Sequence, residues 1–244
     1  MLALGTIVNT GAILVGGTAG ALLKNGISEK YKSMIQNSIG LAVIAIGISG
    51  TAQGMLTCVS GGTLERSYTM VMIFSLLIGG IIGELLNIEG HLDHIGQRLQ
   101  NHFKDGNGVS EGFIIATLLF CVGAMSIVGA LEDGLNGNPS TLYAKAILDG
   151  VMAAVLASTF GYGVLFSAAS VLIYQGSITL LAGVVKPLLT TSVITQISVV
   201  GNVLILAIGF SMLGIKKIKV GNLIPAVFIP IVYYSIQQIV LHMG

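Results

Sequence analysis

The sequence predicts an all-α, polytopic transmembrane helix bundle, and two observations carry this prediction. Hydrophobic residues make up 54% of the 244-residue chain and charged residues only 9%. An ordinary soluble domain is about 25% charged, so this chain has too few ionised groups to cover a folded surface in water. The apolar residues also form long continuous runs, whereas the strands of a membrane β-barrel alternate apolar and polar residues.

The apolar runs predict about eight membrane spans within a single domain that covers residues 1–244. A hydrocarbon core about 30 Å thick requires about 20 mostly apolar residues per crossing. The predicted spans lie near residues 4–23, 36–56, 68–87, 112–131, 145–160, 163–185, 194–214 and 221–241. The fifth span is the shortest and has a polar start, so a re-entrant segment is the alternative to a full crossing there.

The positions of lysine and arginine predict the orientation, because cytoplasmic connections are enriched in these residues. Eight of the 11 basic residues fall in the first, third and seventh connections. We therefore expect the odd-numbered connections in the cytoplasm and both termini outside it. The formal net charge is only +1, which leaves no basic surplus for binding nucleic acid.

The third connection, residues 89–104, predicts an amphipathic helix that lies on the inner membrane surface or on the protein itself. Apolar residues such as Leu92, Leu99 and Phe103 recur there at helical spacing between polar residues. Three histidines in this segment lack a motif such as HExxH. A solvated polar face is therefore favoured over a metal site, and we expect no cofactor other than a bound Na⁺.

Two kinds of internal similarity suggest repeats. The sequence LVGGTAGALL at residues 14–23 matches LIGGIIGELL at 77–86, and AIGIS at 45–49 matches AIGFS at 207–211. The second match joins spans of opposite direction, which is typical of the inverted repeats of transporters. A shared bias towards Gly, Ile and Leu is the alternative explanation.

Glycine is abundant, with 34 residues, and several glycines stand four residues apart. Gly16 with Gly20, and Gly79 with Gly83, form the small-xxx-small pattern that lets membrane helices approach closely. We expect these glycines to pack helices together, and they also allow a homo-oligomer. The alternative is a glycine-lined pore.

Polar residues within the spans are the candidate binding residues, because an ionisable group there costs at least about 2.5–3.5 kcal/mol to insert. Lys145 and Asp149 are four residues apart, so one helix face can hold them as a pair. A carboxylate beside an ammonium stays ionised, which suits cation coordination better than proton storage. A solvated outer loop, and for Glu84 a wetted helix end, are the alternatives. The predicted set is Asn9, Thr10, Glu84, Asp133, Lys145, Asp149 and Gln175.

The strings GTIVNTGAILVGG, FCVGAMSIVGALEDGLNG and LYAKAILDGVMAAVLASTFGYGVLFSA resemble those of the YqgA-like bacterial integral-membrane family. This family is known as a domain of unknown function, and the resemblance covers essentially the whole chain. It implies a protein of the bacterial inner membrane and a candidate transport protein without an assigned substrate. The family pattern includes six of the seven candidate residues, all except Thr10, and gives them no established role.

These observations predict a secondary transporter or exporter of a small polar solute, coupled to Na⁺ or H⁺. An oligomeric ion or solute channel is the main alternative, and a scaffold without transport is another. We expect no enzyme, because no general base accompanies an intramembrane serine. The sequence also contains no nucleotide-binding GxxxxGK[ST] motif. The expected partners are the lipid bilayer and the solute or ion.

Overall fold

The computed structural model describes residues 3–24, 29–58, 64–92, 94, 109–121 and 124–243 of the chain. The fold of these residues is almost entirely helical, which confirms the all-α prediction. The helices are α1 (Leu4–Lys24), α2 (Glu29–Met55), α3 (Thr69–Leu85), α5 (Val109–Cys121), α6 (Ala124–Asn136), α7 (Ser140–Phe160), α8 (Gly163–Leu180), α9 (Ala182–Val185), α10 (Thr191–Met212), the 3₁₀ helix η1 (Val220–Phe228) and α11 (Ile229–Met243). A short antiparallel pair, β1 (Leu56–Cys58) and β2 (Leu64–Arg66), follows α2.

Six of the described helical segments are long and apolar enough to cross a membrane, which confirms a helical membrane protein. They include α1, most of α2, α7, α8, α10 and the continuous segment of η1 and α11. The predicted fourth span, 112–131, is instead two helices, α5 and α6, bent by 58°. Counted as one crossing, this pair gives seven spans, and α3 is a shorter apolar helix of 17 residues. The structure therefore supports six or seven of the eight predicted spans.

The fifth predicted span is a full-length helix. Its helix α7 has 21 residues and begins at Ser140, directly after Pro139. Proline is well suited to a helix start, since its φ angle is fixed near the helical value and it has no N–H to leave unpaired. The helix thus begins five residues before the expected start of this span, and Lys145 and Asp149 lie inside it.

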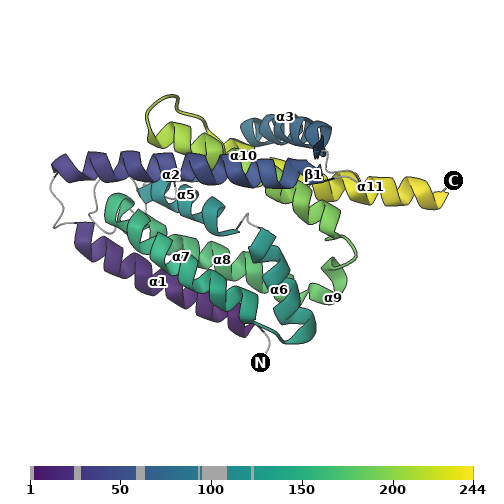
Figure 1. The fold of residues 1–244 in the computed structure, drawn as a ribbon, viewed down its shortest axis with the longest axis horizontal. Helices are drawn as coiled ribbons and strands as arrows, with labels where there is room; N and C mark the ends of the chain where they lie inside the picture. Colours follow the sequence, from purple (N-terminus) through teal and green to yellow (C-terminus); the bar gives the residue numbers. More distant parts are fainter. Residues whose placement is uncertain are drawn as a thin grey trace.

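The helices form two layers that lie side by side (Figure 1). One layer contains α1, α6, α7 and α8, and the other contains α2, α3, α10, η1 and α11. Helix α5 packs against α7 and α8, and both α5 and α6 also contact α10. The chain enters the first layer, passes through the second, returns to the first, and ends in the second. Each layer is therefore built from two separate parts of the sequence.

Glycines bring α1 and α7 into backbone contact, as the spacing of Gly16 and Gly20 predicts. A Cβ atom on Gly16 would lie 2.0 Å from the carbonyl oxygen of Gly150, and one on Gly20 would lie 2.1 Å from that of Ala154. Both contact positions advance by four residues, so the two helices run parallel. Only a residue without a side chain fits at such distances, which confirms the packing interpretation for these two glycines.

Close backbone contact at paired glycines also occurs in the second layer. Gly79 and Gly83 of α3 face η1. A Cβ added to Gly79 would lie 2.3 Å from the Cα atom of Ala226, and one added to Gly83 would lie 1.8 Å from the carbonyl oxygen of Asn222. The match between residues 14–23 and 77–86 thus corresponds to two glycine pairs that each seat a partner segment. Helical packing is their shared role.

The similar segments 45–49 and 207–211 lie opposite each other in the antiparallel contact of α2 with α10. A Cβ on Gly47 would lie 2.7 Å from the backbone nitrogen of Leu206, and one on Gly209 would lie 2.5 Å from Cγ1 of Ile44. Each glycine therefore faces the residue three positions before the matching glycine of the other helix. The sequence match coincides with a locally two-fold contact.

Only the beginning of the amphipathic helix expected over 89–104 belongs to the described residues. Residues 88–92 are helical, and Leu92 packs against the hydrophobic core. Residue 93 and residues 95–108 lie outside the described part, and so does His102. Among the described residues, no group of three or more His, Cys, Asp or Glu could hold a metal ion.

Candidate functional site

The charged pair predicted on the fifth span is formed and buried. Lys145 donates from Nζ to Oδ2 of Asp149, and the two residues are only 5% and 6% exposed. The ammonium also lies 5.9 Å from the centroid of the Phe120 ring, within cation–π distance. Two charged side chains are thus buried within a helix that is long and apolar enough to span a membrane. An ionised group in such a segment has a high free-energy cost.

Two amides from other helices extend this pair into a larger hydrogen-bonded group. Asn9 of α1 donates from Nδ2 to Oδ2 of Asp149 at 3.0 Å and to Oε1 of Gln175 at 3.2 Å. Gln175 of α8 in turn donates from Nε2 to Oγ of Ser126 on α6 at 2.8 Å. Asn9, Gln175 and Ser126 are fully buried. We call this set, Lys145, Asp149, Asn9, Gln175 and Ser126, the buried polar network.

The close approach of α1 to α7 allows this network to form. Gly150 follows Asp149 directly, and its backbone is the surface against which Gly16 packs. With the two helix backbones in contact, the short side chain of Asn9 reaches the carboxylate of Asp149. The small-residue packing and the polar site therefore have one structural cause.

Asp133, another residue of the predicted set, forms its hydrogen bond outside the buried polar network. Its Oδ2 atom accepts a hydrogen bond from the backbone N–H of Gly5 at 3.0 Å. This N–H belongs to the first turn of α1, whose N–H groups have no partner within the helix. Asp133 thus caps α1 from α6, and Thr10 hydrogen-bonds within its own helix, to the carbonyl of Thr6 at 2.8 Å.

Glu84 also lies apart from the buried polar network, in the other layer. It accepts hydrogen bonds from Nζ of Lys219 at 2.7 Å and from Nδ2 of Asn222 at 2.5 Å. Its side chain is 61% exposed, which fits the alternative interpretation of Glu84 as a wetted helix end. The hydrogen bond to this carboxylate raises the pKa of Lys219 above its ordinary value.

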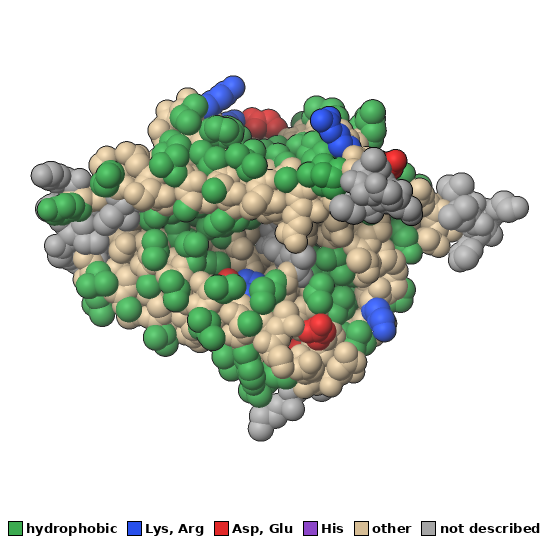
Figure 2. All heavy atoms as spheres, viewed as in Figure 1, with side chains coloured by type: hydrophobic (Ala, Val, Ile, Leu, Met, Phe, Trp, Pro, Cys, Tyr) green, Lys and Arg blue, Asp and Glu red, His purple; other side chains and the backbone are tan. Residues whose placement is uncertain are grey.

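A cavity of about 700 Å³ reaches the buried polar network from one side. Its walls come from α2, α5, α7 and α10, and they are apolar except at a few positions that include Asp149, Ser38 and Asn202. Figure 2 shows the molecular surface hollowed between the two helix layers, with charged side chains at the bottom of the hollow. Asp149 thus belongs both to the network and to a space that a solute could enter.

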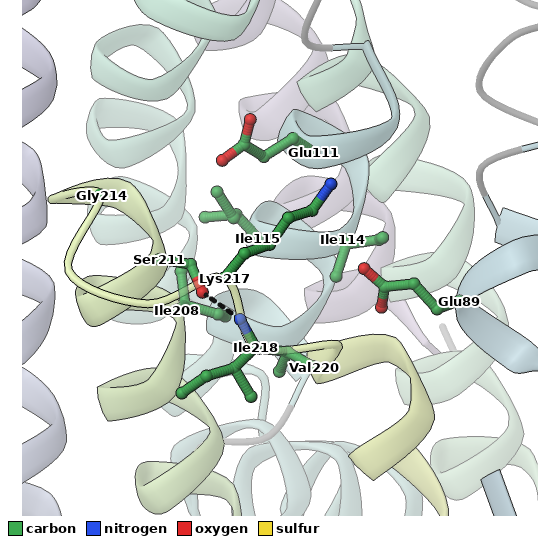
Figure 3. A pocket seen from close by; sticks show the side chains of 10 residues that line it. All are labelled: Glu89, Glu111, Ile114, Ile115, Ile208, Ser211, Gly214, Lys217, Ile218 and Val220. Atoms are coloured by element: carbon green, nitrogen blue, oxygen red, sulfur yellow. Dashed lines mark hydrogen bonds between the residues drawn. The ribbon is translucent and has the colours of Figure 1, made fainter. Parts of the chain in front are cut away.

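A second cavity, of about 420 Å³, lies near the start of α5. The side chains of Glu89, Glu111 and Lys217 border it, and isoleucines form much of the rest of its wall (Figure 3). Ser211 accepts a hydrogen bond from the backbone N–H of Ile218 at 3.2 Å and so holds the connection after α10 in place. Sequence reasoning missed this cavity, because its charged residues come from three distant segments and lie at helix ends.

Of the seven predicted residues, the structure brings together Asn9, Lys145, Asp149 and Gln175. It adds Ser126, which sequence reasoning missed because a single serine in an apolar run usually hydrogen-bonds within its own helix.

Comparison with known proteins gives relatives along almost the whole chain. The model of the family described as "Protein of unknown function (DUF554)" matches residues 4–235. The chain is 39% identical over 226 residues to the uncharacterized membrane protein YdfK of Bacillus subtilis, covering 93% of each chain. It is 30% identical over 234 residues to the uncharacterized protein YqgA of Escherichia coli, covering 93% of this chain and 94% of that one. No solved structure matches it.

Proposed function

This chain belongs to the DUF554 family of proteins of unknown function, and we propose that it is a secondary transporter of a small polar solute, coupled to Na⁺ or H⁺. It would work in the inner membrane of a bacterium, with both termini outside the cytoplasm. The resemblance to YqgA-like proteins noted from the sequence agrees with the family match.

The observation that carries the proposal is the buried polar network. Asp149 is the tenth of the 21 residues of α7, so it would lie near the middle of the membrane. Replacing a buried ion pair by apolar residues is often neutral or stabilising, so stability alone is a weak reason for this pair. Substrate and ion sites of secondary transporters lie near the midplane.

The network offers both acceptors and donors to a solute. The carboxylate of Asp149 accepts hydrogen bonds, the amides of Asn9 and Gln175 can both accept and donate them, and Lys145 can pair with an anionic group. A solute in the 700 Å³ cavity would reach Asp149 first. It would then take over hydrogen bonds that Asn9 and Lys145 now make to this carboxylate, so that binding loosens contacts between α1 and α7.

The two-layer arrangement supports a transport cycle over a static role. The cavity beside Asp149 lies between the layers, and movement of one layer against the other would open it to alternate sides. The two-fold contact of α2 with α10, centred on similar sequences, fits inverted repeats, which commonly underlie such alternating access.

The proposal can be tested by measuring currents from reconstituted vesicles on a solid-supported membrane. Amino acids, amines and organic acids would be applied in turn under imposed Na⁺ or pH gradients. We expect a transient, saturable current for one of these classes, and an increase in KM for that solute in Gln175→Ala. The control Glu132→Gln, which changes a carboxylate outside the network, should leave KM unchanged. Sustained unitary currents that ignore the gradients would refute the transporter and indicate the channel.

A further inference from the structure

A second group of buried polar atoms lies beside the network and has no role in it. The oxygens Thr6 Oγ1, Asn9 Oδ1, Asp133 Oδ1 and Thr179 Oγ1 are shielded from solvent and have no hydrogen-bond partner among the described residues. The four residues are at most 1% exposed. Buried polar side-chain atoms are nearly always satisfied, so four unsatisfied oxygens on neighbouring helices require an explanation.

The antiparallel contact of α1 with α8 brings two of these oxygens to one level. Asn9 is hydrogen-bonded to Gln175, and Gly17, further along α1, packs against Leu165, earlier in α8. In this register, one turn back along α1 leads to Thr6 and one turn forward along α8 leads to Thr179. Both threonines are therefore displaced in the same direction from the Asn9–Gln175 hydrogen bond, by about 4.5 Å along α1 and about 6 Å along α8 at 1.5 Å per residue.

Helix α6 places a carboxylate at the same level. Asp133 is hydrogen-bonded through Oδ2 to the N–H of Gly5, next to Thr6. The following residue, Gly134, lies against α8, where a Cβ would be 2.3 Å from the carbonyl oxygen of Thr179. The carboxyl group thus lies between the start of α1 and the end of α8, with its Oδ1 atom unused.

We propose that Asp133, Thr6, Thr179 and the Asn9 carbonyl oxygen form a binding site for a sodium ion. All four ligand atoms are oxygens, which suit a hard cation. The single carboxylate balances one positive charge, and a divalent ion would normally recruit more carboxylates. The ion would satisfy all four oxygens at once.

The same amide would connect this ion to the solute site. Asn9 would offer Oδ1 to sodium while its Nδ2 atom donates to Asp149 and Gln175. Bound sodium would then fix the orientation of the Asn9 amide, and so prepare Asp149 for the solute. This coupling role rests on the proposed transport function, whereas the ion site itself rests on the unsatisfied oxygens.

The site can be tested on the purified full-length chain in detergent, by equilibrium binding of radiolabelled sodium and by thermal unfolding in sodium or choline chloride. We expect saturable binding and a higher Tm in sodium. Asp133→Asn should weaken binding by about tenfold or more, because it removes a charged ligand. Glu132→Gln, a matched change at the neighbouring carboxylate, should bind sodium like the unchanged protein.

Since Asp133→Asn also weakens the cap of α1, a second variant keeps the test independent of folding. Thr179→Val removes only a hydroxyl and preserves the hydrogen bond of Asp133 to Gly5. It should lose the sodium-dependent rise in Tm while unfolding normally in choline. Unchanged sodium binding in Thr179→Val and Asp133→Asn, or no saturable binding by the folded unchanged protein, would overturn the site.

The outcomes also separate this site from the proposed function. Solute transport that is driven by a pH gradient, together with absent sodium binding, would reject the ion site and keep the transporter. Sodium binding that is lost in both variants, in a protein that moves no solute, would support the site and reject the transporter.

Discussion

Replacing Lys145 by methionine should destabilise the protein, because it leaves the carboxylate of Asp149 without its counter-charge. In the structure this carboxylate is 6% exposed and otherwise receives a hydrogen bond from Asn9. Removing one partner of a buried ion pair typically costs about 3–5 kcal/mol. We expect a loss at the lower end of this range, about 3 kcal/mol, because the Asn9 hydrogen bond partly compensates the charge.

The double variant Lys145→Met with Asp149→Asn should recover most of this loss. Asparagine is uncharged and can still accept the hydrogen bond from Asn9, so the buried charge disappears together with its partner. The coupling free energy between the two positions should therefore reach about 2 kcal/mol, within the range for residues in contact.

The assay is reversible unfolding in mixed detergent micelles of increasing SDS content, followed by far-ultraviolet circular dichroism. Lys186→Met, which removes a lysine outside the network, serves as the control and should change the free energy of unfolding little. If Lys145→Met lowers the free energy of unfolding by less than about 1 kcal/mol, as is typical of exposed ion pairs, Lys145 and Asp149 do not form a buried ion pair.

Two further predictions concern packing and the network, and both are measured by the same unfolding assay. Gly20→Ala should lower the free energy of unfolding by about 1–3 kcal/mol, because its Cβ would lie 2.1 Å from the carbonyl oxygen of Ala154. The control Gly11→Ala, whose Cβ would meet nothing within 4 Å, should not lower it. Ser126→Ala should cost about 1–3 kcal/mol, because it removes the acceptor for the buried Nε2 atom of Gln175; equal unfolding curves would place that amide in contact with another acceptor.

Most of the buried polar network could be predicted from the sequence. Asn9, Lys145, Asp149 and Gln175 stand out because amide and charged side chains within apolar runs need partners, and other helices are their main source in a membrane. Hydroxyl residues give no such signal, since they can satisfy themselves within their own helix. Ser126 and the unsatisfied threonines of the proposed sodium site therefore required the structure.

The hydrogen-bond partners of Asp133 and Glu84 could not be predicted, for a different reason. Both stand in or beside apolar runs, but hydropathy reports composition and contains no information on the direction of a helix. Asp133 lies on α6, after the 58° bend that separates this helix from α5, and is hydrogen-bonded to the start of α1. Glu84 lies in the layer opposite the network, where Lys219 and Asn222 bind it. Both positions depend on long-range packing.

The glycine pattern shows how far local spacing can lead. The spacing of Gly16 and Gly20 correctly predicted a close helix contact. Spacing alone does not identify the partner helix, and only the fold shows that the partner is α7. The similarity of segments 45–49 and 207–211 likewise does not show that they are in contact, and only the fold shows that α2 and α10 pack against each other there.

The most direct test is the rate of solute uptake by Asp149→Asn in vesicles that contain the same amount of folded protein as those with the unchanged chain. If this carboxylate binds the transported solute at the centre of the bilayer, uptake should fall to the level of protein-free vesicles. Uptake equal to that of the unchanged protein would show that the solute crosses the membrane without it.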